Sequence, residues 1–146
     1  TCALPILQTS ARNQWFGTVT ARDNLQIQQH IEILLADGTT RLKAAITAQS
    51  AGRLELDEGK EVLVLLKAPW VSITRDPDAA KTADNQLQGT ISHIERGQTQ
   101  CEVLMTLAEG QPLCATVPLS ESDNLEEGAA VTAYFNADRV IIATLC

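Results

Sequence analysis

The chain has 146 residues, of which 45% are hydrophobic and 3% aromatic, and its formal net charge is −7. This composition excludes a disordered chain, and the length allows one ordinary domain or two very small ones. The acidic balance argues against a nucleic-acid-binding module, because an acidic surface repels phosphate backbones. With so few aromatic residues, we expect thin aliphatic cores that gain stability from burial against a twin unit or a second chain.

The first half of the chain predicts three strands, a short helix and two further strands. A turn at Asp37-Gly38 separates the second strand from the third, and Thr47 or Ser50 is available to cap the helix. The last strand follows Pro69, and the charged segment 74–84 is typical of a linker. Apolar alternation or continuity places the strands at 16–21, 27–35, 41–46, 61–66 and just after residue 69, with the helix within 47–54.

The second half of the chain repeats the first. Residues 13–19 match residues 85–91, so that Gly17 aligns with Gly89 at an offset of 72 (89 − 17). Asp37-Gly38 aligns with Glu109-Gly110 at the same offset, whereas Glu58-Gly59 aligns with Glu127-Gly128 at 69 (128 − 59), which implies three deleted residues. Three glycines that keep their register indicate a true internal duplication rather than a chance likeness.

The repeat predicts an all-β fold with short helices, built as a tandem pair of five-stranded OB-like barrels. We expect the first barrel at 1–73, a linker at 74–84 and the second barrel at 85–146. The second barrel would have its short helix within 120–125 and its last strands at 131–135 and 140–144.

No catalytic motif is present, so we predict that the chain is not an enzyme, and an enzyme is the weaker hypothesis. His30 alternates within a strand and is interpreted as structural or surface-exposed. The four cysteines, Cys2, Cys101, Cys114 and Cys146, form no C-x-x-C pair, and with only two histidines a zinc site is not expected.

The surroundings of Cys101 and Cys114 favour buried free thiols in a reducing compartment, although two disulfides are possible on paper. We expect no membrane association and a cytoplasmic location, since the chain shows neither a long apolar run nor a signal peptide. It begins at Thr1 rather than Met, which suggests a fragment of a longer protein.

Three pairs of residues suit an oxyanion site, which needs charged and neutral donors without a carboxylate among them. Ser10 and Arg12 are two apart and project to one side of an extended segment. Thr47 and Ser50 begin the expected helix, where backbone N–H groups favour an anion. Lys67-Ala68 offers an ammonium and a backbone N–H before Pro69, which lacks one. Taken singly, the three groups also fit a surface pair, a helix cap and an edge lysine.

The second repeat has lost both cations of this set. Its equivalents of Ser10, Arg12, Thr47, Ser50 and Lys67 are Thr82, Asp84, Leu119, Ser122 and Asn136. Because a carboxylate replaces the guanidinium, the second repeat cannot hold the same site. We therefore predict one strong anion site per chain.

The string Thr9-Ser10-Ala11-Arg12-Asn13, followed by Gly17-Thr18-Val19 and later by Leu66-Lys67-Ala68, resembles the molbindin or Mop family of molybdate-binding domains. Nearly the entire chain is similar to the C-terminal tandem Mop region of molybdate-dependent transcriptional regulators.

This resemblance implies a homodimer that binds molybdate or tungstate at the subunit interface, without direct metal ligation by side chains. By the same resemblance, Ser10 and Arg12 of one chain and Thr47, Ser50, Lys67 and Ala68 of the other contact the ligand. DNA would be bound only by an N-terminal winged helix-turn-helix domain outside this chain. Three other interpretations stay open: an intracellular molybdate store or carrier, a purely structural dimerisation module, and an OB barrel for single-stranded nucleic acid.

Overall fold

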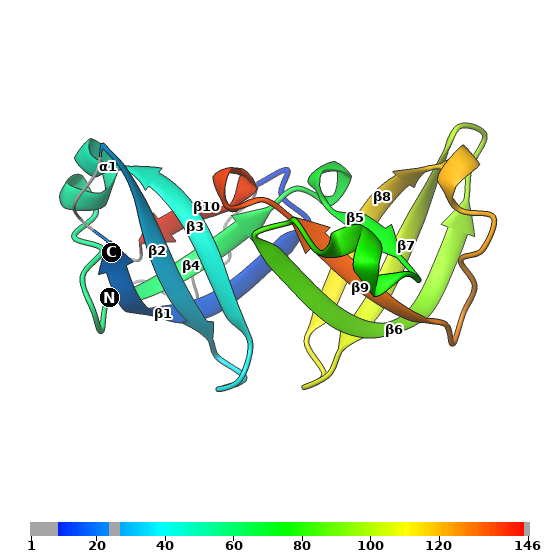
Figure 1. Cartoon of the computed structure of the whole chain (residues 1–146), viewed down its shortest axis with the longest axis horizontal. Coiled ribbons are helices and arrows are strands. Elements are labelled where there is room, and N and C mark those ends of the chain that lie inside the picture. Colours follow the sequence, from blue (N-terminus) through cyan, green and yellow to red (C-terminus); the bar gives the residue numbers. More distant parts are fainter. Residues whose placement is uncertain (1–8, 24–26, 145–146) are drawn as a thin grey trace. The chain divides into compact units, whose positions relative to one another are not determined.

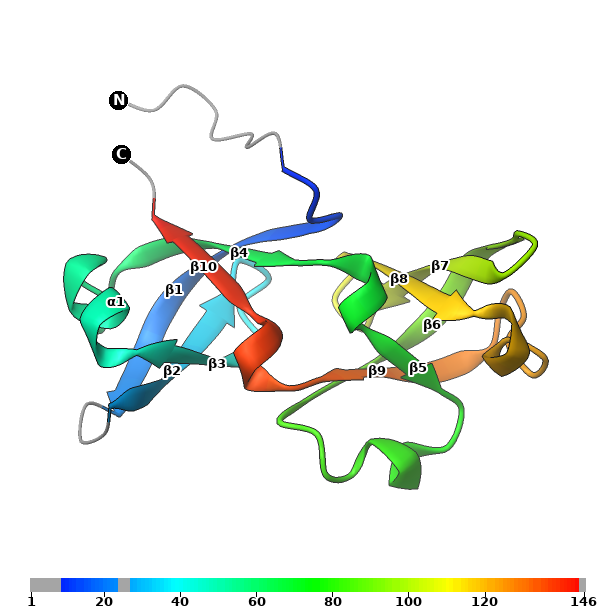
Figure 2. The same ribbon diagram turned by 90° about the horizontal axis from the view of Figure 1, so that it is seen from above.

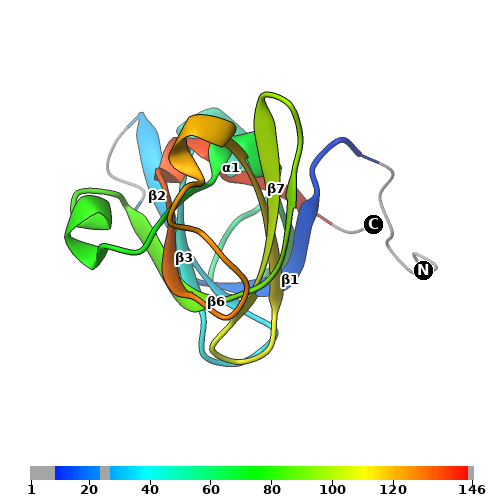
Figure 3. The same ribbon diagram turned by 90° about the vertical axis from the view of Figure 1, so that its right-hand side faces the viewer.

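The computed structural model describes residues 9–23 and 27–144, so the predictions about Cys2 and Cys146 lie outside the described residues. The chain forms two compact units. Each contains a five-stranded antiparallel sheet that curls around its own core, as the side view and the end-on view show (Figures 1 and 3). The predicted all-β class, with a tandem pair of five-stranded OB-like barrels and short helices, is confirmed.

The first unit runs to Leu66 and also includes the chain from Asn136 onward. Its strand order is β10-β4-β1-β2-β3, with a six-residue helix after β3. The elements are β1 (Asn13–Asp23), β2 (Gln28–Leu35), β3 (Arg41–Thr47), α1 (Ala48–Arg53), β4 (Glu61–Leu66), the 3-10 turn η4 (Ala137–Arg139) and β10 (Ile141–Thr144).

The second unit comprises residues 67–135 and has the strand order β5-β9-β6-β7-β8. Where the sequence predicted a helix within 120–125, the structure has only a 3-10 turn, because Leu119 stands at the position of the capping Thr47. The elements are η1 (Ala68–Trp70), β5 (Ser72–Thr74), η2 (Pro77–Ala80), β6 (Asn85–Arg96), β7 (Gln100–Leu107), β8 (Pro112–Pro118), η3 (Leu119–Glu121) and β9 (Ala130–Phe135).

The two sheets exchange their short edge strands. β10 of the second repeat pairs with β4 of the first, and Figure 2 shows these two strands side by side. β5 of the first repeat pairs with β9 of the second. The compact units therefore differ from the sequential ranges 1–73 and 85–146, although those ranges still describe how the sequence repeats.

The exchange is symmetric at the level of single residues. Ile141 lies opposite Leu65 in the first unit, and Ser72 lies opposite Tyr134 in the second. These two pairs are equivalent at the offset of 69 residues. Each repeat thus supplies four strands to one sheet and the fifth strand to the other.

Close strand packing explains the first glycine of each repeat. A Cβ atom at Gly89 would lie 2.4 Å from the carbonyl oxygen of Thr106, and one at Gly17 would lie 2.6 Å from Cγ2 of Ile33. Shortly after each glycine the register shifts at a β-bulge, between Val19 and Ala21 in β1 and at the equivalent place in β6. Bulges increase strand twist and help a sheet to curl. The repeated glycines therefore mark the point where each long first strand bends around its core.

Aliphatic side chains fill the core of each unit, as the low aromatic content predicted. In β4, Val62 to Leu66 are all buried, which explains its continuous apolar sequence. Ile31, Ile33 and Leu42 are fully buried in the first unit. Among the described residues, no helix is long and apolar enough to cross a membrane.

Candidate functional site

Ser10 and Arg12 lie at the entry to β1. Both are exposed, whereas Ala11 between them is buried against Leu63 and Leu65. Ala11 also donates its N–H to Thr9 Oγ1 at 3.3 Å. The buried alanine thus anchors an extended segment whose two polar neighbours face away from the core, as the two-residue spacing predicted.

Thr47 and Ser50 form one local motif at the start of α1. Thr47 is the N-cap, and its Oγ1 accepts the backbone N–H of Ser50 at 3.2 Å. Ala51 is fully buried and holds the short helix on the core of the first unit. The interpretation of Thr47 as a helix cap is confirmed. Because a hydroxyl is both a donor and an acceptor, the O–H of Thr47 can still donate to an anion.

Lys67 and Ala68 begin the second unit at the start of η1. Lys67 is half-buried, and its Nζ lies 5.2 Å from the centroid of the Trp70 ring. An ammonium at this distance is attracted to the face of the indole. Ala68 is buried, and Pro69 follows it within the first positions of the turn. The ammonium of Lys67 is thereby held close to a chromophore that can report on its surroundings.

The structure keeps the members of each predicted pair together. Ser10, Arg12, Thr47 and Ser50 belong to the first unit, whereas Lys67 and Ala68 belong to the second. Within the set of six, a hydrogen bond joins Ser50 to Thr47. Their assembly into one site stays a prediction.

The second repeat uses its equivalent positions differently. Ser122, the equivalent of Ser50, is only 1% exposed and donates its hydroxyl to the carbonyl oxygen of Leu119 at 2.7 Å. Arg96 binds the same turn, because its Nη2 donates to the carbonyl oxygens of Ser122 at 3.2 Å and Leu125 at 2.5 Å. The O–H of Ser122 thus donates within its own turn and not to a ligand. This arrangement was not predictable from the sequence, because Arg96 and Ser122 lie far apart in the chain.

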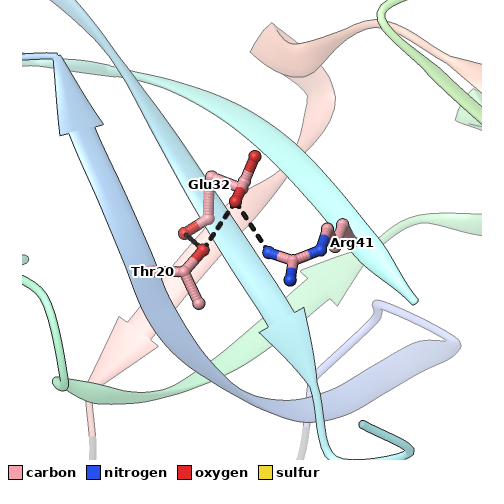
Figure 4. Close-up of polar contacts among 3 residues, drawn as sticks. All are labelled: Thr20, Glu32 and Arg41. Carbon is pink, nitrogen blue, oxygen red and sulfur yellow. Dashed lines mark hydrogen bonds and ion pairs between the residues drawn. The ribbon is translucent and has the colours of Figure 1, made fainter. Parts of the chain in front are cut away.

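Carboxylates engage two other cations of the first unit. In Figure 4, Glu32 Oε1 accepts hydrogen bonds from Thr20 Oγ1 at 2.8 Å and from Arg41 Nη1 at 2.9 Å. Arg22 lies 2.9 Å from Asp57 Oδ1, and its Nε donates to the buried Gln29. Arg22 and Arg41 are therefore ion-paired parts of the sheet surface.

Several other predicted roles can be compared with the structure. His30 is exposed on β2, in agreement with its interpretation as a structural or surface residue. Cys101 and Cys114 are buried free thiols, as predicted. Within residues 9–23 and 27–144, no group of His, Cys, Asp and Glu side chains is arranged to hold a metal ion.

Comparison with known proteins gives a family match over both repeats. The TOBE domain model matches residues 9–73 and 81–142. The chain is 72% identical over 140 residues to the DNA-binding transcriptional dual regulator ModE of Escherichia coli K12, which covers 96% of the chain and 53% of that protein. It is 61% identical over 142 residues to the transcriptional regulator ModE of Yersinia pestis, covering 96% of the chain and 54% of that protein. The chain thus spans about half the length of these curated relatives.

A solved structure matches nearly the entire fold. It is the cytoplasmic molybdate-binding protein ModG with molybdate bound, at a TM-score of 0.90 and 34% sequence identity. The match covers 95% of this chain and 100% of that one. The tandem arrangement of both units is therefore shared with a protein of known structure.

Proposed function

The chain belongs to the TOBE domain family, and from this premise we propose that it is the molybdate-sensing and dimerising part of a DNA-binding transcriptional regulator. The observation that carries the proposal is the match of both units to a molybdate-bound protein at a TM-score of 0.90. The identity of 72% to a transcriptional regulator over 96% of the chain supports the regulatory role.

The proposed molybdate site combines two chains. Ser10 and Arg12 come from one chain, and Thr47, Ser50, Lys67 and Ala68 come from its partner. The exposure of Arg12 and the remaining donor capacity of the Thr47 hydroxyl support these roles. Molybdate or tungstate would be held by hydrogen bonds alone, without a direct bond from a side chain to the metal atom.

Charge neutralisation couples binding to the arrangement of the two chains. A tetrahedral dianion placed between Arg12 of one chain and Lys67 of the other is attracted to both, so its binding free energy favours the subunit arrangement that brings the cations together. The homodimer is thus part of the proposal. We expect size to discriminate against sulfate, because both oxyanions accept the same kinds of hydrogen bond.

DNA recognition would lie outside this chain. With a formal net charge of −7, the chain itself is poorly suited to bind DNA. We propose that an N-terminal winged helix-turn-helix domain reads DNA in the full-length cytoplasmic regulator, and that molybdate changes the spacing of two such domains in the dimer.

A calorimetric titration with molybdate tests the proposal, with tungstate as a second ligand and sulfate and phosphate as controls. We expect one tight molybdate site per chain and little response to sulfate. The emission of Trp70 should change during the titration, because Lys67 Nζ lies 5.2 Å from its ring. A Trp70→Phe variant separates this signal from that of the buried Trp15.

The outcome also separates the alternatives. An absence of molybdate binding would leave a purely structural dimerisation module. Tight binding would suit a molybdate store or carrier equally well, so a second measurement is needed. Sedimentation of the chain with and without molybdate tests the dimer, and DNA binding by the full-length protein tests the regulatory role. If molybdate does not change the affinity of the full-length protein for DNA, the interpretation as a molybdate store or carrier is favoured.

A further inference from the structure

The second unit has a cavity whose lining includes none of the six residues of the proposed oxyanion site. This cavity of about 560 Å³ lies over one face of the sheet and is lined by residues of β6, β7 and β9 and by the segment that follows β5. Figures 1 and 2 show the course of these elements. Arg75 and Pro77 form one wall. All of its lining residues belong to the second unit, so that one compact body contains the whole cavity.

Strand register brings four polar side chains to this face. Gln88 lies opposite Thr132, and Thr90 lies opposite Thr106. Gln88 and Thr90 are two apart on β6, and such residues share a face of a strand. All four line the cavity. Thr132 is only 5% exposed, so a ligand oxygen that enters the cavity meets a hydroxyl largely shielded from bulk water.

The lining favours a negatively charged ligand. No Asp or Glu lines the cavity, although the chain has 18 acidic residues against 11 basic ones. Arg75 supplies a guanidinium, of which Nη1 donates to the carbonyl oxygen of Asn124 at 3.0 Å. A guanidinium has five N–H donors, so others can reach a ligand. The neighbouring Asp76 is not among the lining residues, and its side chain accepts the N–H of Asp78 at 3.0 Å as the cap of η2.

The first repeat lacks this set of donors on the equivalent face. Phe16 lies opposite Leu63, and Thr18 lies opposite Leu34, in the same register as the two pairs of the second unit. Three of the four polar residues in the second repeat therefore replace apolar ones of the first. This difference concentrates hydrogen-bonding groups in the second unit, at a place where the shared fold does not need them.

We propose that this cavity binds a small organic anion. Its carboxylate or phosphate group would accept hydrogen bonds from Arg75 and the threonine hydroxyls, and its apolar body would lie against Pro77 and Ala130, which shares the face of Thr132 on β9. The volume lies within the range of about 300–1,000 Å³ typical of small-molecule pockets, and it exceeds what a single tetrahedral oxyanion fills. The inference goes beyond the proposed function and does not depend on it.

Nuclear magnetic resonance of the ¹⁵N-labelled chain tests the site, with phenyl phosphate and benzoate as anionic probes. Neutral benzyl alcohol and inorganic phosphate are the controls for charge and for the apolar body. We expect saturable shifts of the backbone amides at 88–90 and 130–132 with at least one aromatic anion, and which of the two binds distinguishes a phosphate from a carboxylate ligand. Inorganic phosphate and benzyl alcohol should bind more weakly.

Variants connect the shifts to the lining. Arg75→Gln should weaken binding about tenfold, because it removes a charge-assisted hydrogen bond, and the isosteric Thr132→Val should weaken it about threefold. Arg41→Gln and Thr18→Val are the matched controls from the first unit, and both should leave the affinity unchanged. Arg12→Ala, which targets the oxyanion site, should also leave it unchanged.

Three results would overturn the inference. These are the absence of saturable shifts with both aromatic anions, equal affinity for benzyl alcohol, and shifts that disappear in Arg12→Ala but persist in Arg75→Gln. A failure of molybdate to bind would contradict the proposed function alone, because the cavity contains none of its residues.

Discussion

At the scale of single residues, the two repeats differ in charge at two positions of the proposed oxyanion site. Arg12 and Lys67 are replaced by Asp84 and Asn136 in the second repeat. A dianion that loses one cationic partner loses a charge-assisted hydrogen bond, which contributes about 1.5–3 kcal/mol. The two cations should therefore dominate the affinity of the proposed site, with the hydroxyl groups adding orientation.

We predict that Arg12→Ala and Lys67→Ala each weaken molybdate binding by about 10- to 100-fold, as that loss of free energy implies. Calorimetry measures the affinity, and sedimentation checks that each variant keeps the oligomeric state of the parent chain. Lys81→Ala, at an exposed position of the second unit, is the control. Unchanged affinity in both Arg12→Ala and Lys67→Ala would refute the residue assignment.

Asp37 is a second residue whose charge has a local role. Burial tends to raise the pKa of its carboxyl, but hydrogen bonds from the Thr40 hydroxyl and from the N–H groups of Thr39 and Thr40 outweigh this effect and hold the pKa below its ordinary value of 3.8. A lowered pKa in the folded state means that the ionised carboxylate stabilises the hairpin turn.

The pH dependence of stability follows from this direction. The contribution of Asp37 is present above pH 3.8, its value when unfolded, and is lost as the pH falls through the lower folded value. Asp37→Asn should thus lower the melting temperature at pH 7 and have a smaller effect in strong acid. Thermal melts across this range check the expectation, with Glu109→Gln at the equivalent turn as the control. An equal loss at every pH would argue against the ionised carboxylate as the cause.

At the scale of elements, Gly17 and Gly89 lie where neighbouring strands approach each other closely. The Cβ of an alanine at position 89 would lie 2.4 Å from the backbone oxygen of Thr106 in β7, whereas at position 17 the equivalent backbone oxygen, that of Leu34, would be 3.0 Å away and the nearest atom would be Cγ2 of Ile33 at 2.6 Å. Overpacking that requires backbone shifts costs about 1–3 kcal/mol. The second sheet at Gly89 thus has less room for a side chain than the first sheet at the equivalent Gly17.

We predict that Gly89→Ala destabilises the chain by about 1–3 kcal/mol and Gly17→Ala by less. Gly52→Ala in α1 is the control, because a Cβ there meets nothing within 4 Å. It should be neutral or stabilise by up to about 1 kcal/mol, since alanine favours a helix over glycine. Urea unfolding gives the three free energies. Similar losses for Gly89→Ala and Gly52→Ala would show that helix and strand glycines are not distinguished by close packing.

At the scale of the whole molecule, exchanged strands connect the two repeats. Each five-stranded sheet needs one strand from the other half of the sequence, β10 in the first unit and β5 in the second. A repeat taken alone would leave an edge of its sheet without the strand that covers it. Buried Ile142 in β10, for example, would be missing from the first unit.

We predict that, when the chain is cleaved between its repeats, the two fragments remain associated under native conditions. A protease site inserted between Lys81 and Thr82 lies at two exposed positions, where insertions are tolerated. After cleavage, native mass spectrometry should find both halves together, and denaturant should separate them. Two halves that part spontaneously and each keep a folded circular dichroism spectrum would contradict the strand exchange.

Features with local causes were predictable from the sequence alone. These were the duplication, the order of strands and short helices, the turns at Asp37-Gly38 and Glu109-Gly110, and the capping role of Thr47. All of them depend on residues that lie close together in the chain, through alternation of side chains, turn glycines and a cap three residues from its donor. The proposed oxyanion site was built from the family resemblance together with local spacing, and its residues stay a prediction.

The tertiary structure alone decided which sheet each short edge strand joins and how distant side chains meet. Backbone hydrogen bonds do not encode their partner, so a three- or four-residue strand such as β5 or β10 can complete either of two similar sheets. The contact of Arg96 with the turn at Ser122 and the donor-lined cavity at Arg75 and Thr132 join residues that lie far apart in the sequence. Local alternation and turn geometry set the register within each hairpin, but the pairing of β5 and β10 with strands of the other repeat is decided by packing between distant parts of the chain.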